Sequence, residues 1–408
     1  MSTTTSRIPG LRVPAERLAG VRRVWAKAGS QTTSTYLLLV LVVAVLNVIG
    51  VVMVLSASSV QSLDSKGSAW WFFERQLLWT GLGVVGFAVA SRIDYRSWRR
   101  YTVPFLGVAV VLLVLVLVPG LGLWVDGSRR WLGVGSWRMQ PSEIAKLALL
   151  VYAADVLTRQ HQQVGDWRKA LRPLLIVFVV FAGLIMREPD LASTMVLTVI
   201  LGAVLIVGGV RGRHLAVIGG AAVSAVTLFA LLVPWRRARM LSFLDPWHDK
   251  SNTGYQVTQS LIALGSGGWT GVGLGASRAK WRFLPAAHTD FIFAIMGEEM
   301  GLIFTLLVVG LFVTIFVAGL MHVRRAPNLF QFLLVTGCLL LICLQAIINL
   351  GVVTGLLPTK GMSLPFISAG GSNLLLMGLL VGIIVNSQRN WERPKPLVRK
   401  RALTEVIG

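Results

Sequence analysis

Long apolar blocks separated by short polar segments constrain the fold more than any other feature of this sequence. The blocks cover residues 36–57, 71–90, 102–118, 142–158, 172–186, 190–210, 214–233, 290–320, 329–352 and 364–387. The hydrocarbon core of a bilayer is about 30 Å thick and takes about 20 helical residues. Because no water can satisfy backbone polar groups there, each block is expected to be a helix. The sequence therefore predicts an all-α, polytopic membrane protein of about ten transmembrane helices.

The basic residues predict the orientation of the chain. The formal net charge is +22, and many Lys and Arg side chains lie in short segments between alternate blocks. Short cytoplasmic loops carry such an excess, and an even number of spans places both termini on one side. We therefore expect both termini in the cytoplasm and no nucleic-acid partner. The basic segments contain Arg92, Arg96, Arg99, Arg100, Arg159, Arg168, Lys169, Arg172, Arg211, Arg213, Arg324 and Arg325.

Three regions follow from this pattern. We expect residues 1–35 to form a disordered, basic cytoplasmic arm and residues 391–408 a cytoplasmic tail. Residues 36–390 are expected to form the membrane domain, with a large extracytoplasmic loop at 234–289. The arm is too long and too polar for the front of a secretory signal, so no cleavage is expected.

Asp290 is the residue that stands out chemically. It is the only acid between Asp249 and Glu298, and we expect Thr289 to cap a helix whose first turn contains it. An ionisable group at such a membrane boundary costs free energy unless it has a partner or a task. Two interpretations remain open: a helix N-terminal charge without chemistry, or a catalytic base that faces the outside.

The helix that follows Asp290 has a stripe of small residues and two acids. Gly297 and Gly301 lie below Asp290 on the expected helix, where they either form a groove for a lipid chain or permit close helix packing. Glu298 and Glu299 are expected to be intramembrane acids with basic partners.

Several basic residues on the outer side are candidates for binding an anion. Glu143 and Lys146 are three residues apart and share a helical face, so Lys146 either pairs with Glu143 or joins Arg138 around an anionic lipid head. Residues Arg278, Lys280 and Arg282 alternate, and in an extended segment they would point the same way, toward a diphosphate or toward solvent.

Three further outer segments contain candidate polar groups. Gln256, Gln259 and Ser260 either offer hydrogen bonds to a sugar or face water. In the last outer segment, Pro and Gly residues interrupt the apolar run, so Lys360, Ser368 and Ser372 either line the same cavity as Asp290 or belong to a plain interhelical loop. The acidic and basic residues at the corner 187–190 are expected to pair with each other.

Five ordered segments together resemble the SEDS family (shape, elongation, division and sporulation proteins) of bacterial cell-wall polymerases. They are WRMQPSEIAKLAL at 137–149, REPD at 187–190, GYQVTQSLIALGSGGWTGVGLG at 254–275, FLPAAHTDFIFAIMGEEMG at 283–301 and LPTKGMSLPFISAGGSN at 357–373. The resemblance covers about residues 36 to 390, and AHTDFIFAI and VMVLSASSV are more similar to its cell-division branch than to its elongation branch. The family usually has Glu where Ala286 stands.

The resemblance implies a glycosyltransferase that polymerises lipid II at the outer face of the cytoplasmic membrane, at the division septum, and releases undecaprenyl diphosphate. It implies that Asp290 is essential and acts as general base, and that Arg138 and Lys146 match positions the family needs. It also implies a class B penicillin-binding protein and other divisome membrane proteins as partners.

The chemistry requires positive charge at the leaving diphosphate, from Arg, from Lys or from a divalent cation such as Mg or Mn. Two other functions stay open from the residues alone. One is a lipid II flippase, for which Lys146 and Glu298 would line a polar path. The other is a division scaffold that recruits a transpeptidase.

Overall fold

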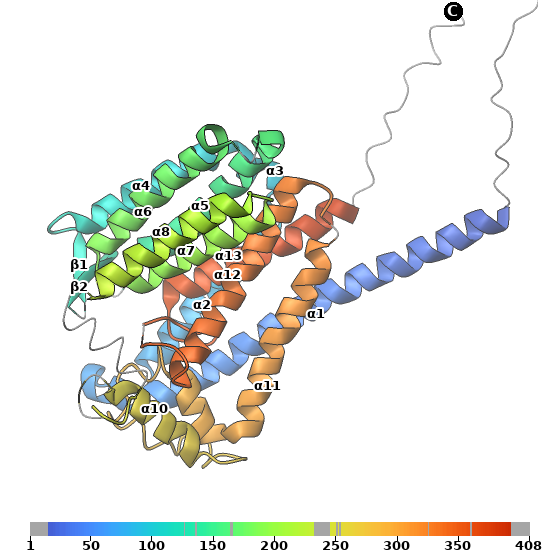
Figure 1. The fold of residues 1–408 in the computed structure, drawn as a ribbon. Helices are drawn as coiled ribbons and strands as arrows, with labels where there is room; N and C mark the ends of the chain where they lie inside the picture. The colour runs from blue at the N-terminus through green and yellow to red at the C-terminus, as the bar shows by residue number, and fades with distance from the viewer. Residues whose placement is uncertain are drawn as a thin grey trace, which may run out of the picture.

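The fold is a bundle of long helices in a computed structural model that describes residues 15–125, 127–134, 137–163, 166–231, 245–249, 252, 254–324, 326–359 and 361–392. Each of the ten apolar blocks has most of its residues in a helix of this bundle (Figure 1). These helices are α1 (Ala15–Lys66), α2 (Trp71–Ala90), α4 (Thr102–Leu117), α5 (Pro141–Arg159), α6 (Arg172–Arg187), α7 (Leu191–Val207), α8 (Gly212–Leu231), α11 (Ile292–Val323), α12 (Leu329–Val353) and α13 (Gly371–Glu392). Shorter helices are α3 (Tyr95–Arg100), α10 (Tyr255–Ser266), the 3-10 helix His161–Gln163 and the π-helix Trp167–Leu171.

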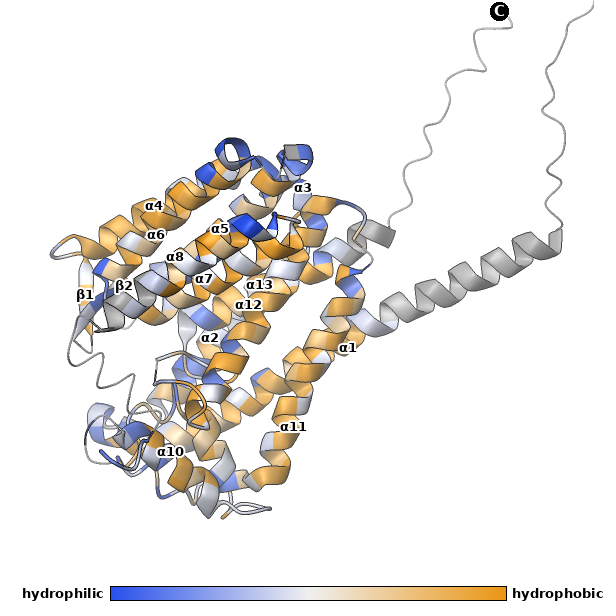
Figure 2. Cartoon of the chain, in the orientation of Figure 1, coloured by the Kyte–Doolittle hydropathy of each residue, from blue (hydrophilic) through white to orange (hydrophobic). Residues whose placement is uncertain are grey.

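The length and composition of these helices suit a membrane. Within the described residues, four helical segments are long and apolar enough to cross a bilayer: Ser34–Lys66, Trp167–Arg187, Ile292–Val323 and Leu329–Val353. Three shorter apolar helices accompany them, and Figure 2 shows apolar residues along the bundle with polar residues gathered toward its ends. Many large apolar side chains on α1, α4 and α11 are exposed, as lipid-facing side chains are. The chain is thus mostly helical with several membrane-type helices, as expected, and ten crossings stay a prediction.

The expectation of an entirely helical fold is wrong in the first outer segment. Residues there form a three-stranded antiparallel sheet of β1 (Gly122–Val125), β2 (Ser128–Val134) and β3 (Trp137–Met139). The sequence between β1 and β2 is Asp126-Gly127, a pair that favours a two-residue hairpin, and Gly127 has a φ of 76°. The strands are short and partly charged, so the apolar pattern alone did not reveal them.

The helices pack so that one end of the bundle carries the irregular segments. The sheet, α10 and the start of α11 lie at one end, which we call the site end, and α3 and the end of α13 lie at the other (Figure 1). Helix α2 packs closely along α13, where a Cβ atom on Gly378 would lie 2.2 Å from the carbonyl oxygen of Gly83. Helix α1 packs along α11, and the buried helix α5 contacts α4, α7 and α12.

The terminal regions coincide only in part with the expected boundaries. Helix α1 begins at Ala15, inside the segment 1–35 that the sequence suggested as an arm. Residues 1–14 and 393–408 lie outside the described residues, and so do residues 234–244, 250, 251 and 253 of the loop 234–289.

Candidate active site

A polar cavity of about 220 Å³ at the site end brings Asp290 and Lys146 together. Strand β2, helices α5, α7, α12 and α13, the turn before α11 and the segment 361–370 all contribute to its wall. Its polar and charged lining comprises Ser128, Arg130, Gln140, Glu143, Lys146, Asp190, Ser193, Thr289, Asp290, Gln345, Ser363, Ser372 and Asn373. Segments from five regions of the sequence therefore converge on one site.

Asp290 lies in a turn that precedes α11, and the expectation that Thr289 caps this helix is wrong. Helix α11 begins two residues after Asp290, and the hydroxyl of Thr289 donates to the carbonyl oxygen of Ala286 at 3.2 Å. The same carbonyl accepts the backbone N–H groups of Thr289 and Asp290, both at 3.1 Å. Because Ala286 has a left-handed φ of 56°, the chain turns here before the helix can start. The half-buried Asp290 side chain lines the cavity.

Lys146 reaches the cavity from α5 with its partner Glu143. The Lys146 Nζ atom lies 2.7 Å from Glu143 Oε2, and the Lys146 side chain is only 3% exposed. Burial strengthens the attraction of a charge for an anion because little water screens it. The Glu143–Lys146 pair, one of the alternatives that the sequence left open, is therefore present, and both of its members border the site.

The corner between α6 and α7 is organised differently from the self-paired turn we expected. Asp190 caps α7 by accepting the backbone N–H of Ser193 at 3.0 Å, and it also accepts the Gln140 Nε2 amide at 2.9 Å. Glu188 is fully buried, and neither of its carboxylate oxygens has a hydrogen-bond partner in the described part of the chain. Desolvation, with a further contribution from Asp190, raises the pKa of Glu188 to about 9, although Arg130 opposes the shift. Glu188 is therefore a neutral acid at pH 7, and the ion pair that we expected within this corner is not formed by its side chain.

The basic run 278–282 does not form one anion-binding face, so that expectation is wrong. The segment is a series of turns rather than a strand, and its three basic side chains differ in burial. Lys280 is 8% exposed, with its Nζ atom 2.6 Å from the Gly275 carbonyl oxygen, whereas Arg282 is exposed and pairs with Asp64. Arg278 is exposed. The cavity lining includes none of the three.

The glutamine and serine side chains on α10 also lie outside the cavity lining. The Ser260 hydroxyl is buried and donates to the Val353 carbonyl oxygen at 2.7 Å, so it joins α10 to the end of α12. Gln256 and Gln259 are half-buried. The buried Ser260 hydroxyl thus serves the packing of α10 on α12, and the sugar-binding role suggested for it stays a prediction.

Four other candidate site residues have different outcomes. Arg138 is exposed on β3 at the site end but is not part of the cavity lining. The buried Ser368 hydroxyl accepts the Leu364 N–H at 2.8 Å and shapes the segment before α13, whereas Ser372 lines the cavity. Lys360 lies outside the described residues.

Below Asp290, helix α11 is interrupted at Gly301, and the glycine-rich segment 267–273 fills the interruption. Gly301 has φ 77° and ψ −176°, so the bonds from Leu302 N to Glu298 O and from Ile303 N to Glu299 O are not made. Instead the N–H groups of Leu302 and Ile303 donate to the carbonyl oxygens of Gly268 (2.9 Å) and Trp269 (3.2 Å). The carbonyl oxygens of Glu298 and Glu299 accept the N–H groups of Val272 (2.9 Å) and Gly273 (3.0 Å). Two helical bonds are thereby replaced by four bonds to the loop.

The small residues of α11 therefore serve close packing. A Cβ atom on Gly301 would lie 2.4 Å from the Gly271 nitrogen, and one on Gly297 would lie 2.4 Å from the Leu264 side chain. Gly297 also borders an apolar cavity of about 260 Å³ between α10 and α11, so the lipid-groove interpretation stays open for that position.

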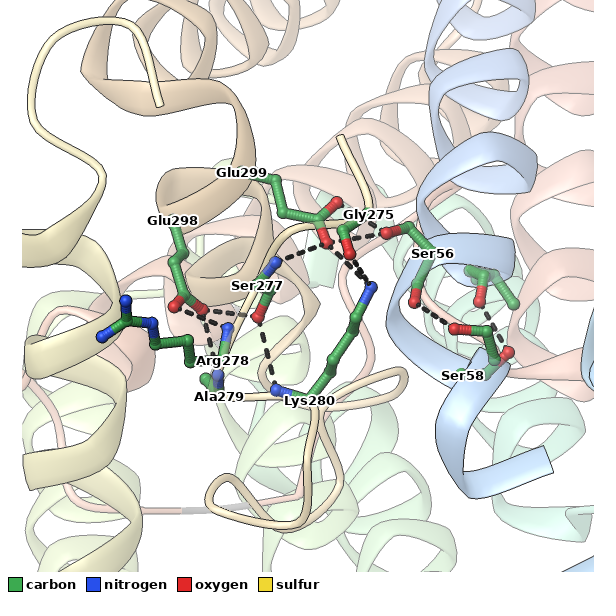
Figure 3. Close-up of polar contacts among 11 residues, drawn as sticks. Ser56, Ser58, Gly275, Ser277, Arg278, Ala279, Lys280, Glu298 and Glu299 are labelled. Atoms are coloured by element: carbon green, nitrogen blue, oxygen red, sulfur yellow. Dashed lines mark hydrogen bonds and ion pairs between the residues drawn. The ribbon is translucent and has the colours of Figure 1, made fainter. Parts of the chain in front are cut away.

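The two glutamates of α11 hold the following part of the loop by their side chains (Figure 3). Glu299 accepts the Ser56 hydroxyl of α1 at 2.6 Å and pairs with Lys280 at 3.5 Å, as expected for an intramembrane acid. Glu298 instead accepts the Ser277 hydroxyl at 2.5 Å and the backbone N–H of Arg278 at 2.9 Å. This buried cluster ties α1, α11 and the loop together beneath Asp290.

The cavity contains three carboxylates, which raises the question of a divalent cation. Glu143 is paired with Lys146, and Asp190 is engaged by Gln140 and Ser193. Over the described ranges, no three acidic, histidine or cysteine side chains gather closely enough to hold a metal ion. Mg²⁺ is usually bound by one or two carboxylates together with substrate phosphates, so a divalent cation at the diphosphate stays a prediction, and we derive no step through one.

Sequence reasoning missed several residues of the site. Arg130, Gln140, Gln345 and Asn373 line the cavity, and Asn349 donates to the backbone of Asp290. One signal was available, because Gln345 and Asn349 are polar, four residues apart, and lie on one face of an otherwise apolar helix.

Known proteins resemble this chain over most of its length. The family model for cell cycle proteins of the FtsW, RodA and SpoVE type matches residues 36–393. A probable peptidoglycan glycosyltransferase FtsW of Coxiella burnetii is 43% identical over 77% of this chain and 85% of its own. The stage V sporulation protein E of Bacillus subtilis is 40% identical over 79% of this chain and 88% of its own.

Solved structures of related proteins also resemble this chain over most of its length. A chain from a peptidoglycan synthase complex that coordinates polymerization and crosslinking superposes with a TM-score of 0.72 at 27% identity, covering 87% of this chain and 98% of that one. The rod shape determining protein RodA of Thermus thermophilus gives a TM-score of 0.64 at 26% identity, covering 87% of this chain and 97% of that one. This chain belongs to the FtsW/RodA/SpoVE family of cell cycle proteins.

Proposed function

We propose that this protein is a peptidoglycan glycosyltransferase that polymerises lipid II, with Asp290 as the general base. The observation that carries the proposal is the shared cavity, in which a half-buried carboxylate faces a buried lysine at one end of a membrane-type bundle. Two of the relatives support the activity, since one is named a probable peptidoglycan glycosyltransferase and another is part of a peptidoglycan synthase complex.

In the proposed reaction, one lipid II offers a sugar 4-hydroxyl and the second offers its anomeric carbon. Asp290 removes the proton of the hydroxyl as its oxygen forms a bond to the anomeric carbon. The bond from that carbon to the diphosphate breaks, and undecaprenyl diphosphate leaves with the electron pair. A positioned general base typically contributes ~10²–10⁴-fold to such a rate.

The leaving diphosphate requires positive charge, and two described cations line the cavity. Lys146 is buried beside Glu143, and Arg130 projects from β2. A positive charge held in a site with little water stabilises a developing anion without having to reorganise. We assign Lys146 and Arg130 to this role in preference to Arg278, Lys280 and Arg282.

The alternative function of a flippase would require a polar path through the bundle. Near the end of α5 away from the site, the buried Asp155 binds Arg99 at 2.9 Å and Arg159 at 2.8 Å. These charges are paired with each other, whereas Lys146 and Arg130 line the same cavity as Asp290. The arrangement favours chemistry at one face over transport.

We further propose that the site faces the outside of the cytoplasmic membrane, with both termini in the cytoplasm, and that the protein acts at the division septum. A class B penicillin-binding protein is the proposed partner, together with other divisome membrane proteins. The match to a chain of a peptidoglycan synthase complex supports a partner of this kind.

The test uses the full-length protein in proteoliposomes containing fluorescent lipid II, with and without a class B penicillin-binding protein. Two quantities are followed: glycan strands that a muramidase can digest, and movement of the lipid between leaflets. We expect strands. Transbilayer movement without strands would identify a flippase, and neither activity in either sample would favour a scaffold.

A further inference from the structure

Asn349 connects Asp290 to the last irregular segment of the site. It lies about one turn before the end of α12 and is 1% exposed. Its Nδ2 amide donates to the carbonyl oxygen of Asp290 at 2.8 Å and to that of Met362 at 2.7 Å. One side-chain amide therefore holds two backbone segments that are far apart in the sequence.

A second hydrogen bond joins the turn before α11 to the segment 361–369, two residues before Asp290. The backbone N–H of Ala369 donates to the His288 carbonyl oxygen at 3.0 Å. Gly361, next to Met362, approaches the Asp290 side chain so closely that a Cβ atom there would lie 2.8 Å from Oδ2. The location of the Asp290 carboxylate in the cavity thus depends on how the segment 361–369 is held.

We propose that Asn349 is a positioning residue for the general base, an inference that rests on the proposed role of Asp290. Asn349 is not part of the cavity lining, so it acts through the backbone of Asp290 and not on substrate. Its Oδ1 atom has no hydrogen-bond partner among the described residues, so the two N–H donors are the part of the side chain in use.

The chemistry of the amide explains why asparagine stands here. A neutral NH₂ group can donate to two carbonyl oxygens at once, whereas a carboxyl group can donate to one when protonated and to none when ionised. Loss of these donors leaves buried carbonyl oxygens unsatisfied, so the two segments separate or rotate. A displacement of about 1 Å at a catalytic group can lower the rate ~10²-fold.

The test compares Asn349→Ala and Asn349→Asp with wild type in lipid II polymerisation by the full-length protein. We expect kcat to fall ~10²-fold in Asn349→Ala with KM within about threefold of wild type, because the effect is on base placement. We expect Asn349→Asp to be more active, relative to wild type, at pH 6 than at pH 8.5, because only the protonated acid donates.

A matched control exists at the other end of the bundle. Asn386 on α13 donates through the same atom to two backbone carbonyl oxygens, those of Ala90 and Ile93, and is also buried. Asn386→Ala removes an equivalent bridge remote from the site. It is expected to lower thermal stability but to leave kcat per folded molecule unchanged.

The outcomes separate the inference from the function on which it rests. If Asp290→Asn is inactive while both Asn349 variants retain wild-type kcat, the positioning role of Asn349 is refuted, but the role of Asp290 as general base is not. An equal loss of kcat in the Asn386 control, or a fall in activity that only follows the folded fraction, also refutes it. Should Asn349→Ala fail to fold, the pH dependence of Asn349→Asp decides. If Asp290→Asn is active, the proposed function itself fails.

Discussion

Adding one methyl group at Gly361 tests whether the location of the Asp290 carboxylate controls the reaction. The Cβ atom of Gly361→Ala would lie 2.8 Å from Asp290 Oδ2, whereas ordinary van der Waals contact begins at 3.4 Å. The carboxylate must therefore move by about 0.6 Å, from the difference 3.4 − 2.8. Catalytic groups need to be held within ~0.5 Å of their productive geometry, and ~1 Å of displacement can remove ~10²-fold of the rate. We expect kcat to fall about 10- to 30-fold.

The same substitution is expected to leave the fold intact. The atom in conflict is the end of a side chain, and Gly361 does not adopt a left-handed φ that would make alanine strained. An alanine at a compatible position usually stabilises a protein by ~0.4–1 kcal/mol. Thermal unfolding of Gly361→Ala should therefore occur at the wild-type temperature or slightly above it.

The assay is initial-rate polymerisation of lipid II by full-length protein, with thermal unfolding measured on the same samples. Gly265→Ala is the matched control, since Gly265 lies on α10 at the same end and a Cβ atom there meets nothing within 4 Å. The reasoning is refuted if Gly361→Ala keeps the wild-type kcat with an intact fold, or if Gly265→Ala loses as much.

Three further substitutions test other parts of the account. Lys146→Met should lower kcat per folded molecule ~10²-fold or more, because the diphosphate loses a buried cation, and full activity would exclude the role. It should also lower thermal stability, because the buried Glu143 loses its partner. Glu299→Ala should lower the free energy of unfolding by about 3 kcal/mol, because it leaves the buried Lys280 unpaired. A double-mutant cycle with Lys280→Met measures the coupling between the two residues. If the losses of the two single variants simply add in the double variant, the pair contributes nothing and this prediction is contradicted. The pKa of Glu188 is about 9 in the folded protein, above its value in the unfolded chain. The contribution of Glu188 to the free energy of unfolding is therefore complete below about pH 4.5 and is lost as the pH rises through 9. Wild type should therefore lose thermal stability relative to Glu188→Gln between pH 6 and pH 9, and parallel curves would show that Glu188 is already ionised.

The sequence located the helices well because their physical basis is local. Each block had to be long enough and apolar enough to satisfy its own backbone in lipid, and this property can be read from one segment at a time. The sheet 122–139 escaped because its strands are short, and its pairing depends on contacts between segments rather than on an apolar pattern.

The candidate site was predictable where a charged residue stood out in apolar surroundings, as Asp290 and Lys146 do. The conformation of the basic run 278–282 was not predictable. Basic residues at alternate positions share a face only in an extended strand, and this segment forms turns. The partner of Lys280 is Glu299 on α11, 19 residues further along the chain, and only the fold of the loop against α11 brings the two together. Neutral residues such as Asn349 and Gly361 gain their importance from contacts with Asp290 that only the folded chain reveals.

The most direct measurement of the central claim is single-turnover polymerisation of lipid II by Asp290→Asn. This substitution keeps the size of the side chain and the backbone carbonyl that Asn349 holds, but it removes the carboxylate that we propose as the proton acceptor. We predict a rate at least ~10²-fold below wild type, with lipid II binding and thermal stability unchanged. Strand formation by this variant at the wild-type rate would contradict the account.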